Sequence, residues 1–432
     1  TPFLHLLPPR LKAALYRLKN SIWTLDPRPL PVRASTPTRN HTSFHNRPPT
    51  PHPIENLPHF WGKPFEQRWW QIEFPSHLLS SYSHLCWKDQ AEATLYLDGF
   101  PSGGFDPAHH FVPLKPNFKE AIIESYCTQA AIWVPGSSSK INSEGSRFEG
   151  AYLAKKNPIA WQNYFDFSVL FDLARWLASR DPNIPNQNSL ESSLFYRHEW
   201  HEADPILRYL IHHLDLAVEL WETNGPLAMS KKLREIFDHL SQPLPNLHAT
   251  TIGHAHIDLV WLWPEDITEA KLVHTFSTVE RLLDQYPEFI FSHSQPAAYR
   301  LLKKRSPELY NQVLSRIQQS RWEPVGALEV EADTFLPTGE ALARSFLLGQ
   351  QQFQNISGYK SLVLWLPDSF GFSASIPTLM AEFDVPFFFS AKLAWSESSR
   401  FPYTSFRWRG MDGSEVIAHL PHDYAAAYNR MG

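Results

Sequence analysis

The chain has 432 residues, of which 43% are hydrophobic and 19% charged, a composition typical of a globular protein with two or three domains. Its formal net charge of -5 gives no reason to expect a nucleic acid or an anionic membrane surface as a partner. The two cysteines argue against a disulfide framework, and no apolar run approaches the roughly 20 residues that cross a bilayer.

The N-terminal region combines a helical pattern with a proline-rich stretch. Leucines and isoleucine recur at helical spacing from Leu11 to Ile22, which predicts an amphipathic helix over residues 9–23 that docks on a neighbouring domain. A helix lying on a membrane surface is the less favoured alternative, because its basic face is modest. Residues 24–58 are rich in Pro, Thr, Asn and His and predict an extended linker that wraps a surface or is disordered.

The next region changes to strand-like runs. Residues 69–74, 93–97 and 130–134 are rich in β-branched and aromatic residues and are separated by glycine turns, which predicts a small β-sandwich. Such a domain could bind sugar or brace a catalytic domain. We favour bracing, because no ligand-like constellation of side chains occurs in this region.

Residues 158–241 predict helices, because their apolar residues lie three and four positions apart. The group His201, His212, His213 and Asp215 suggests a metal cluster. However, adjacent residues point roughly 100° apart on a helix, so His212 and His213 cannot easily face one ion. We interpret these side chains as surface or interdomain residues.

The stretch 253–264, GHAHIDLVWLWP, predicts the end of a strand that runs into a polar loop. Side chains alternate along an extended segment, so His254, His256 and Asp258 point to one side. Two imidazoles and a carboxylate suit zinc, which binds nitrogen and oxygen ligands. The alternative for this motif alone, and the more frequent one, is a pair of core histidines beside a loop aspartate.

A second strand end strengthens the metal hypothesis. Residues 361–366 form a short apolar run typical of a buried parallel strand, and Asp368 follows directly in the segment PDSFGF. The carboxyl ends of such strands are where α/β folds place ligands. Taken alone, Asp368 is better explained as a turn residue. Two strand ends that both carry such side chains are harder to explain as turns.

The rest of the C-terminal region alternates helices and strands, which indicates a mostly parallel α/β layout. The expected helices cover residues 265–286, 296–305, 307–320 and 339–354, and the expected strands lie at 289–291, 325–331 and 361–366.

The segments GHAHID, WLWP and WLPDSFGFS resemble the catalytic domain of the glycoside hydrolase family 38 α-mannosidases. Further matching segments are FSHSQP at 291–296, PELY at 307–310, RWEPVG at 321–326, EAD at 331–333, TGE at 338–340, AKLAW at 391–395 and WRGMDGS at 408–414. The segments LDG at 97–99 and GFD at 104–106 are similar to the cytosolic and vacuolar branch of that family. The catalytic resemblance begins near residue 248.

The resemblance implies an irregular seven-stranded α/β barrel, preceded by a β-sandwich and a helical segment. The expected division is residues 1–58 for the helix and linker, 59–157 for the sandwich, 158–245 for the helical segment and 246–432 for the catalytic α/β domain. The implied protein is cytoplasmic, or vacuolar in a eukaryote. It acts on mannose-containing oligosaccharides and associates with neither nucleic acid nor membrane, and it could form homo-oligomers.

The resemblance also implies roles for individual residues. His256, Asp258 and Asp368 are expected zinc ligands, with cobalt as an alternative ion, and Asp368 is in addition the expected nucleophile of a retaining glycosidase. His254 is expected to support a ligand rather than to bind the metal.

Three further residues are expected to surround the sugar. The resemblance implies that Trp261 and Phe370 line the mannose site, for which core packing is nearly as good an explanation. It also places Lys392 as a basic residue near the nucleophile. Without the resemblance, Lys392 would be taken for a solvated lysine.

Two departures from the family pattern stand out. The family supplies a fourth ligand, a histidine, and an acid/base aspartate downstream of the nucleophile, and the chain stops at Gly432. We therefore expect an N-terminal fragment with weak or no activity, unless Asp412, His419, His422 or Asp423 fills these roles. In addition, the segment GALEV at 326–330 replaces one that usually has another glycine and a tryptophan, which affects the expected shape of that loop.

Two functions of other classes remain open. A metal-dependent amidohydrolase also places histidine pairs at strand ends, but it would need further histidines and would lack the PDSFG loop. A carbohydrate-binding remnant without catalysis is the second alternative.

Overall fold

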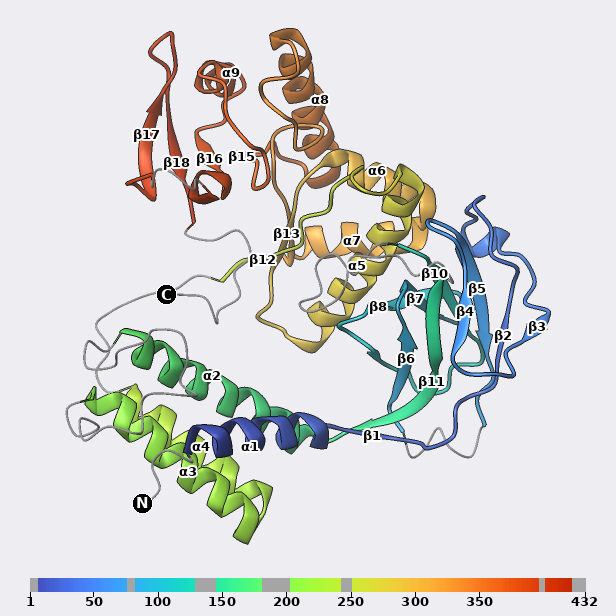
Figure 1. Ribbon diagram of the computed structural model, residues 1–432. Coiled ribbons are helices and arrows are strands. Elements are labelled where there is room, and N and C mark those ends of the chain that lie inside the picture. The colour runs from blue at the N-terminus through green and yellow to red at the C-terminus, as the bar shows by residue number, and fades with distance from the viewer. Residues whose placement is uncertain are drawn as a thin grey trace.

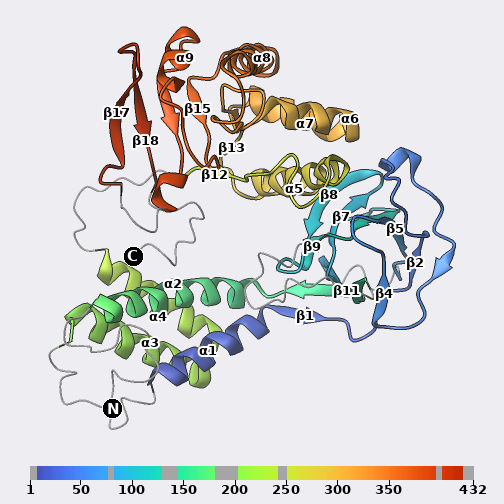
Figure 2. The same ribbon diagram turned by 45° about the horizontal axis from the view of Figure 1, so that its top comes forward.

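The computed structural model describes residues 7–75, 82–128, 145–180, 203–241, 251–395 and 401–421. Figure 1 shows three parts: a bundle of helices, a β-sandwich and an α/β part. Figure 2 shows from a second direction that α5 lies between the sandwich and the rest of the α/β part. Of the described helices, none is both long and apolar enough to cross a membrane.

The helical bundle joins the N-terminal helix to the middle of the chain. Its helices are α1 (Leu7–Ser21), α2 (Pro158–Arg180), α3 (Pro205–Asn224) and α4 (Pro226–Leu240). They share one apolar core, and α1 contributes Leu11 and Leu18 to it. The prediction that the first helix docks on other elements is therefore confirmed.

The suggested histidine cluster of the bundle is not a metal site among the described residues. Asp215 forms an ion pair with Arg10 of α1, and the ring of His213 packs against Tyr209 at 4.1 Å. In the described part of the chain, the groups of side chains that are close enough to bind one metal ion do not include these residues. His201 lies outside the described residues.

The β-sandwich consists of two antiparallel sheets. One has the order β1-β11-β6-β9, with β4 paired to β11, and the other has the order β3-β2-β5-β10-β7-β8. The strands are β1 (Trp23–Leu25), β2 (Val32–Ala34), β3 (His52–Pro53), β4 (His59–Trp61), β5 (Gln67–Ile72), β6 (His84–Asp89), β7 (Glu92–Leu97), β8 (Phe100–Phe105), β9 (Phe111–Pro113), β10 (Ala121–Tyr126) and β11 (Ser146–Lys156). The expected linker 24–58 thus supplies strands to the sandwich, and it also contains the short helix η2 (Phe44–Asn46). The expected strand at 130–134 lies outside the described residues.

The six-stranded sheet is covered on both faces. Along β5, Trp70 points into the core between the two sheets, and its neighbour Trp69 points to the opposite side. Trp69 packs there in one cluster with Phe276 of α5 (Glu265–Gln285). Because side chains alternate along a strand, two adjacent tryptophans can serve two cores. The sandwich is therefore packed directly against the α/β part.

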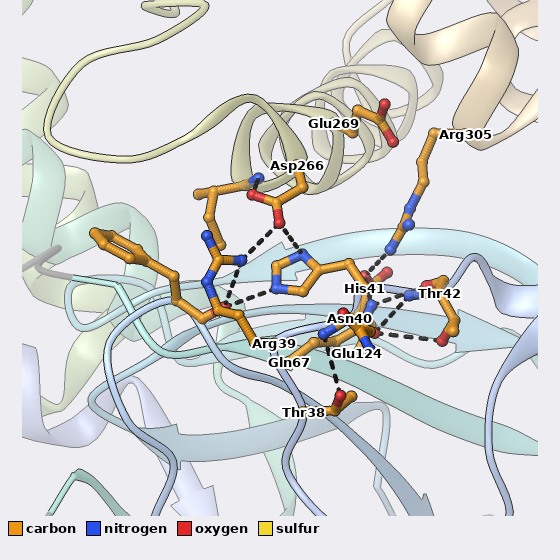
Figure 3. Close-up of polar contacts among 12 residues, drawn as sticks. Thr38, Arg39, Asn40, His41, Thr42, Gln67, Glu124, Asp266, Glu269 and Arg305 are labelled. Carbon is orange, nitrogen blue, oxygen red and sulfur yellow. Dashed lines mark hydrogen bonds and ion pairs between the residues drawn. The ribbon is translucent and has the colours of Figure 1, made fainter.

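A buried ion pair crosses the same boundary (Figure 3). Arg305 at the end of α6 (Pro296–Arg305) binds Glu124 of β10, and the two side chains are 5% and 1% exposed. Glu124 also accepts hydrogen bonds from Gln67 at 2.6 Å and from Tyr96 at 2.9 Å. Every carboxylate oxygen of Glu124 thus has a partner, as a buried charge requires.

The expected linker also contacts the first turn of α5 (Figure 3). Arg39 donates to the carboxylate of Asp266 at 2.6 Å, and His41 lies 3.8 Å from the same carboxylate. The segment around residues 39–41 therefore lies against the beginning of α5, which follows the GHAHID loop.

Among its described residues, the α/β part contains seven strands in two sheets. The parallel sheet β12-β13-β14 consists of β12 (Gly253–His254), β13 (Phe291–His293) and β14 (Trp322–Pro324). The second sheet has the order β15-β16-β18-β17, with β15 (Val363–Trp365), β16 (Phe387–Phe389), β17 (Ser405–Arg409) and β18 (Glu415–His419). A single parallel bridge between Gly326 and Leu364 links the two sheets. The described residues show no closed barrel, so barrel closure stays a prediction.

Four helices of the α/β part follow the expected positions closely, and two short ones, over residues 376–382 and 392–395, were not expected. Besides α5 and α6 they are α7 (Pro307–Gln318), α8 (Gly339–Ser357), α9 (Ile376–Glu382) and the short η5 (Lys392–Trp395). Thr338 caps α8 by accepting a hydrogen bond from the amide of Ala341 at 3.2 Å. The strand expected at 325–331 was wrong, because β14 ends at Pro324 and only the bridge at Gly326 continues the pairing.

Candidate active site

The GHAHID motif begins at the parallel pairing of β12 with β13. His254 is paired with Ser292, and Nδ1 of His254 donates to the Ser292 carbonyl oxygen over 2.9 Å. Burial lowers the pKa of His254, so the neutral imidazole is favoured. The backbone hydrogen bond fixes the orientation of the ring at the start of the loop.

His256 lies at the centre of the site. Its Nε2 atom is 3.2 Å from Oδ1 of Asp258 and 3.6 Å from Oδ2 of Asp368. Its Nδ1 atom is 2.9 Å from Oε2 of Glu331. One imidazole is thus surrounded by three carboxylates that come from three different segments of the chain.

The carboxylates change the protonation of His256. Burial of the ring disfavours its charged form, but hydrogen bonds to Asp258 and Glu331 outweigh burial and raise the pKa of His256 to about 10. These carboxylates therefore favour the charged imidazolium over the neutral ring. A divalent ion would supply that positive charge instead.

Asp368 and Lys392 meet because they follow neighbouring parallel strands. Asp368 follows β15 and Lys392 follows β16, and these strands are paired in parallel. The Nζ atom of Lys392 forms an ion pair with Oδ1 of Asp368, and the lysine side chain is only 4% exposed. The interpretation of Lys392 as a solvated lysine is therefore wrong.

The arrangement around His256 fits a metal ion. His256, Asp258 and Asp368 offer ligand atoms that all lie within 4.8 Å of one another. Two ligands of a tetrahedral zinc ion are roughly 3.4 Å apart when each bond is about 2.1 Å, and the 3.2 and 3.6 Å separations are close to that value. Glu331 on the remote nitrogen completes the carboxylate–histidine–metal pattern that orients ligating histidines.

Glu331 is the main site residue that sequence reasoning did not identify. Its side chain is 6% exposed, and its carboxylate accepts a hydrogen bond from Ser294 as well as contacting His256. A second group of close ligand atoms joins Glu331 to His254 and His256. An acidic residue in the loop after a strand would have been the signal for Glu331. The expected strand over residues 325–331 placed Glu331 inside the strand, whereas β14 ends at Pro324.

The two expected sugar-lining aromatics are not core residues. Phe370 is 76% exposed and Trp261 is 40% exposed, so packing in an apolar core does not explain either of them. The Nζ atom of Lys392 lies 4.4 Å from the ring centroid of Phe370. Phe370 therefore flanks the Lys392–Asp368 pair. Trp261 packs edge-on against Trp263, with ring centroids 5.2 Å apart.

The residues considered for missing roles lie elsewhere or have other partners. Asp412 accepts hydrogen bonds from Thr378 at 2.7 Å and from the Ser414 hydroxyl at 2.6 Å. Such hydrogen bonds, with that from Ser414 first, lower the pKa of Asp412 to about 2, which suits a turn residue. Nδ1 of His419 lies 2.8 Å from the Ser405 hydroxyl. His422 and Asp423 lie outside the described residues.

Curated relatives match both the C-terminal part and most of the chain. An alpha-mannosidase of Saccharomyces cerevisiae is 42% identical over 182 residues, which cover 42% of this chain and 17% of the relative. Alpha-mannosidase 2C1 of Homo sapiens is 28% identical over 377 residues, which cover 83% of this chain and 34% of the relative. The chain thus spans about a third or less of the length of these relatives.

The comparison with solved structures is weaker. The crystal structure of an alpha-mannosidase from Enterococcus faecalis V583 aligns with a TM-score of 0.36 and 22% identity. The alignment covers 40% of this chain and 20% of that one.

The family comparison concerns the part of the chain that carries the site. Residues 246–430 match the family described as "Glycosyl hydrolases family 38 N-terminal domain". This range contains His256, Asp258, Glu331, Asp368 and Lys392. Residues 246–430 of the chain are therefore similar to the N-terminal domain of glycosyl hydrolase family 38.

Proposed function

We propose that the protein is a metal-dependent retaining α-mannosidase that removes terminal mannosyl residues from oligosaccharides. The observation that carries this proposal is the convergence of His256, Asp258 and Asp368, with Lys392 paired to Asp368. The family likeness of residues 246–430 and the relatives that are called alpha-mannosidases support it.

Asp368 is the proposed nucleophile. Its Oδ1 atom is held by Lys392 and its Oδ2 atom faces Nε2 of His256, so the carboxylate has a defined orientation. One of its oxygens forms a bond to the anomeric carbon while the bond from that carbon to the leaving oxygen breaks. Water then displaces the carboxylate from the opposite face, and the proton that this water releases balances the one that the leaving oxygen takes up. The original anomeric configuration returns and Asp368 is freed.

The metal is proposed to be held by His256 through Nε2 and by one oxygen each from Asp258 and Asp368. Zinc is the favoured ion and cobalt a substitute, because imidazole nitrogen and carboxylate oxygen suit both. When bound, the ion supplies Lewis-acid polarisation to sugar hydroxyls next to the reacting carbon. Glu331 holds the imidazole from its other nitrogen and keeps Nε2 directed at the two aspartates.

The surroundings are proposed to recognise a mannose residue. Exposed Phe370 and Trp261 offer apolar ring faces of the kind that pack against the C–H face of a sugar. The seven strands of the α/β part are proposed to belong to a barrel, with the sandwich bracing it from the side of α5. The buried pair of Glu124 and Arg305 supports that bracing role.

The proposal is tested with an activated aryl α-mannoside. Such a leaving group departs without prior protonation, so the assay reports on the nucleophile and the metal and does not require a general acid. We expect the hydrolysis to depend on added Zn²⁺ or Co²⁺. NMR should detect α-mannose as the first product, and Asp368→Asn should abolish hydrolysis.

A matched control is Asp384→Asn. Asp384 is exposed and has a left-handed backbone with φ of 58°, which asparagine adopts as readily as aspartate. The Asp384→Asn variant should hydrolyse the aryl α-mannoside at the same rate as the unchanged protein. Release of β-mannose first would exclude a retaining mechanism, and sugar binding without any hydrolysis would identify a binding domain instead of an enzyme.

A further inference from the structure

Gln295 lies between the metal-site segments with an unusual backbone conformation. It directly precedes α6, is 4% exposed, and has φ of 64° and ψ of 90°. Residues other than glycine rarely adopt positive φ, and such strain persists only where the surroundings enforce it. The conformation therefore indicates that the side chain of Gln295 is held in place by strong contacts.

Those contacts are two hydrogen bonds from a single amide group. Nε2 of Gln295 donates to the carbonyl oxygen of Ile257 over 2.9 Å, and Oε1 accepts from the backbone N–H of Glu331 over 3.1 Å. Ile257 lies between His256 and Asp258 in the sequence. The amide thus joins the backbone that carries two proposed ligands to the backbone of the residue that orients His256.

We propose that Gln295 is a positioning residue that sets the relative placement of Glu331 and the His256–Asp258 loop, and thereby the affinity for a divalent cation. The inference rests on the proposed function, because it concerns the same metal site. The contact it governs is the 2.9 Å approach of Glu331 Oε2 to His256 Nδ1, which requires both segments to be in register.

A side-chain amide can make both bonds at this position. The Ile257 carbonyl needs a donor and the Glu331 N–H needs an acceptor, and glutamine offers one of each on a single planar group. A glutamate of nearly the same size keeps the acceptor but places a negative oxygen against the Ile257 carbonyl. A methionine of similar length removes both bonds and leaves two backbone groups without this partner.

The chain contains a matched control in Gln350 on α8. Gln350 is 3% exposed, and its amide makes the same kind of bridge: Nε2 donates to the Ser361 carbonyl and Oε1 accepts from the Ser361 N–H, both over 2.8 Å. Ser361 lies at the opposite end of β15 from Asp368. Loss of this bridge therefore costs two equivalent hydrogen bonds, and neither of them is made to Ile257 or Glu331.

The first experiment compares Gln295→Met and Gln350→Met in the metal-free protein by hydrogen–deuterium exchange. We expect both variants to lower Tm to a similar extent. We expect only Gln295→Met to speed exchange in peptides covering residues 253–262. Equal exchange of these peptides in the two variants would overturn the inference, and this result does not depend on any metal.

The second experiment measures Co²⁺ affinity by titration. Loss of a residue that supports a metal ligand typically weakens binding about 10–100-fold, and we expect this for Gln295→Met but not for Gln350→Met. Gln295→Glu, which preserves size if the methionine variant fails to fold, should show the same weakening. Gln295→Gly relieves the positive φ but lacks the amide, and unchanged affinity in this variant would overturn the inference.

The two proposals fail in different ways. If the unchanged protein binds no Co²⁺ while exchange near residues 253–262 still responds only to Gln295→Met, the proposed metal-dependent function fails and the positioning role stands. If the unchanged protein binds Co²⁺ and all Gln295 variants bind it equally well, the positioning role fails and the proposed function stands.

Discussion

Lys392 and Asp368 form an ion pair where the parallel strands β15 and β16 end, and the lysine side chain is almost completely buried there. A buried ammonium retained next to a carboxylate costs desolvation energy that only close pairing offsets. The pair holds one oxygen of Asp368 and leaves the other directed at His256. This relationship makes Lys392 the first residue to test beside the proposed nucleophile.

Replacing Lys392 by methionine should lower kcat/KM for an activated aryl α-mannoside by about 10²-fold or more, because a preorganised cation next to the reacting carboxylate is lost. Lys392→Arg keeps the positive charge and should lower kcat/KM by a smaller factor. Steady-state kinetics gives kcat/KM for both variants, and circular dichroism checks that they fold. Unchanged kcat/KM in Lys392→Met would show that the lysine serves only packing.

Glu331→Gln should weaken Zn²⁺ or Co²⁺ binding about 10–100-fold, since the negative partner of His256 Nδ1 is lost while the shape of the side chain is kept. Competition with a chromophoric chelator measures the affinity. Asp333→Asn is the control, because Asp333 is a nearby carboxylate that accepts hydrogen bonds from the N–H groups of Phe335 and Leu336 at 2.7 and 2.8 Å. A similar loss of metal affinity in both variants would assign the effect to the reduced negative charge near the site and not to the contact with His256.

The buried pair of Glu124 and Arg305 should matter for stability rather than for chemistry. Removing one partner leaves an uncompensated buried charge, so Arg305→Met should lower the free energy of unfolding by about 3–5 kcal/mol. Glu124→Gln/Arg305→Met removes both charges and should recover a large part of that loss. Urea unfolding of the single and double variants measures the coupling free energy between Glu124 and Arg305. Additive losses of unfolding free energy in the double variant would contradict the prediction.

Acid should destabilise the fold through His293, which is completely buried. Burial lowers the pKa of His293 well below its ordinary value of about 6.5, so the unfolded chain binds a proton that the folded chain does not. The stabilisation from the neutral ring is fully present above pH of about 6.5 and is lost as the pH falls below it, at up to about 1.4 kcal/mol per pH unit.

The variant His293→Phe removes this titration. Urea unfolding between pH about 6.5 and 4.5 should therefore show a shallower slope for His293→Phe than for the unchanged protein, even if the variant is less stable throughout. Identical slopes would show that other groups cause the acid sensitivity.

Local patterns in the sequence predicted much of the fold. The helices at α5, α6, α7 and α8 lie close to the expected ranges, because apolar periodicity and caps such as Thr338 act within a few residues. The segment 24–58 was expected to be a linker that wraps a surface or is disordered. It is extended along the sandwich, but its prolines and polar residues hide short strands that pair with the sandwich sheets. A strand of three residues has too little periodicity to be recognised without its partner strand.

The sequence by itself determined which residues could carry the chemistry: His256 and Asp258 alternate after one strand, and Asp368 follows another. Tertiary structure alone decided how they are held. Glu331 and Gln295 reach the site from segments 75 and 38 residues after His256 and Ile257, and Lys392 is buried only because β16 pairs with β15. Side-chain periodicity reports which face a residue occupies, whereas the identity of its partner across space depends on how distant segments pack.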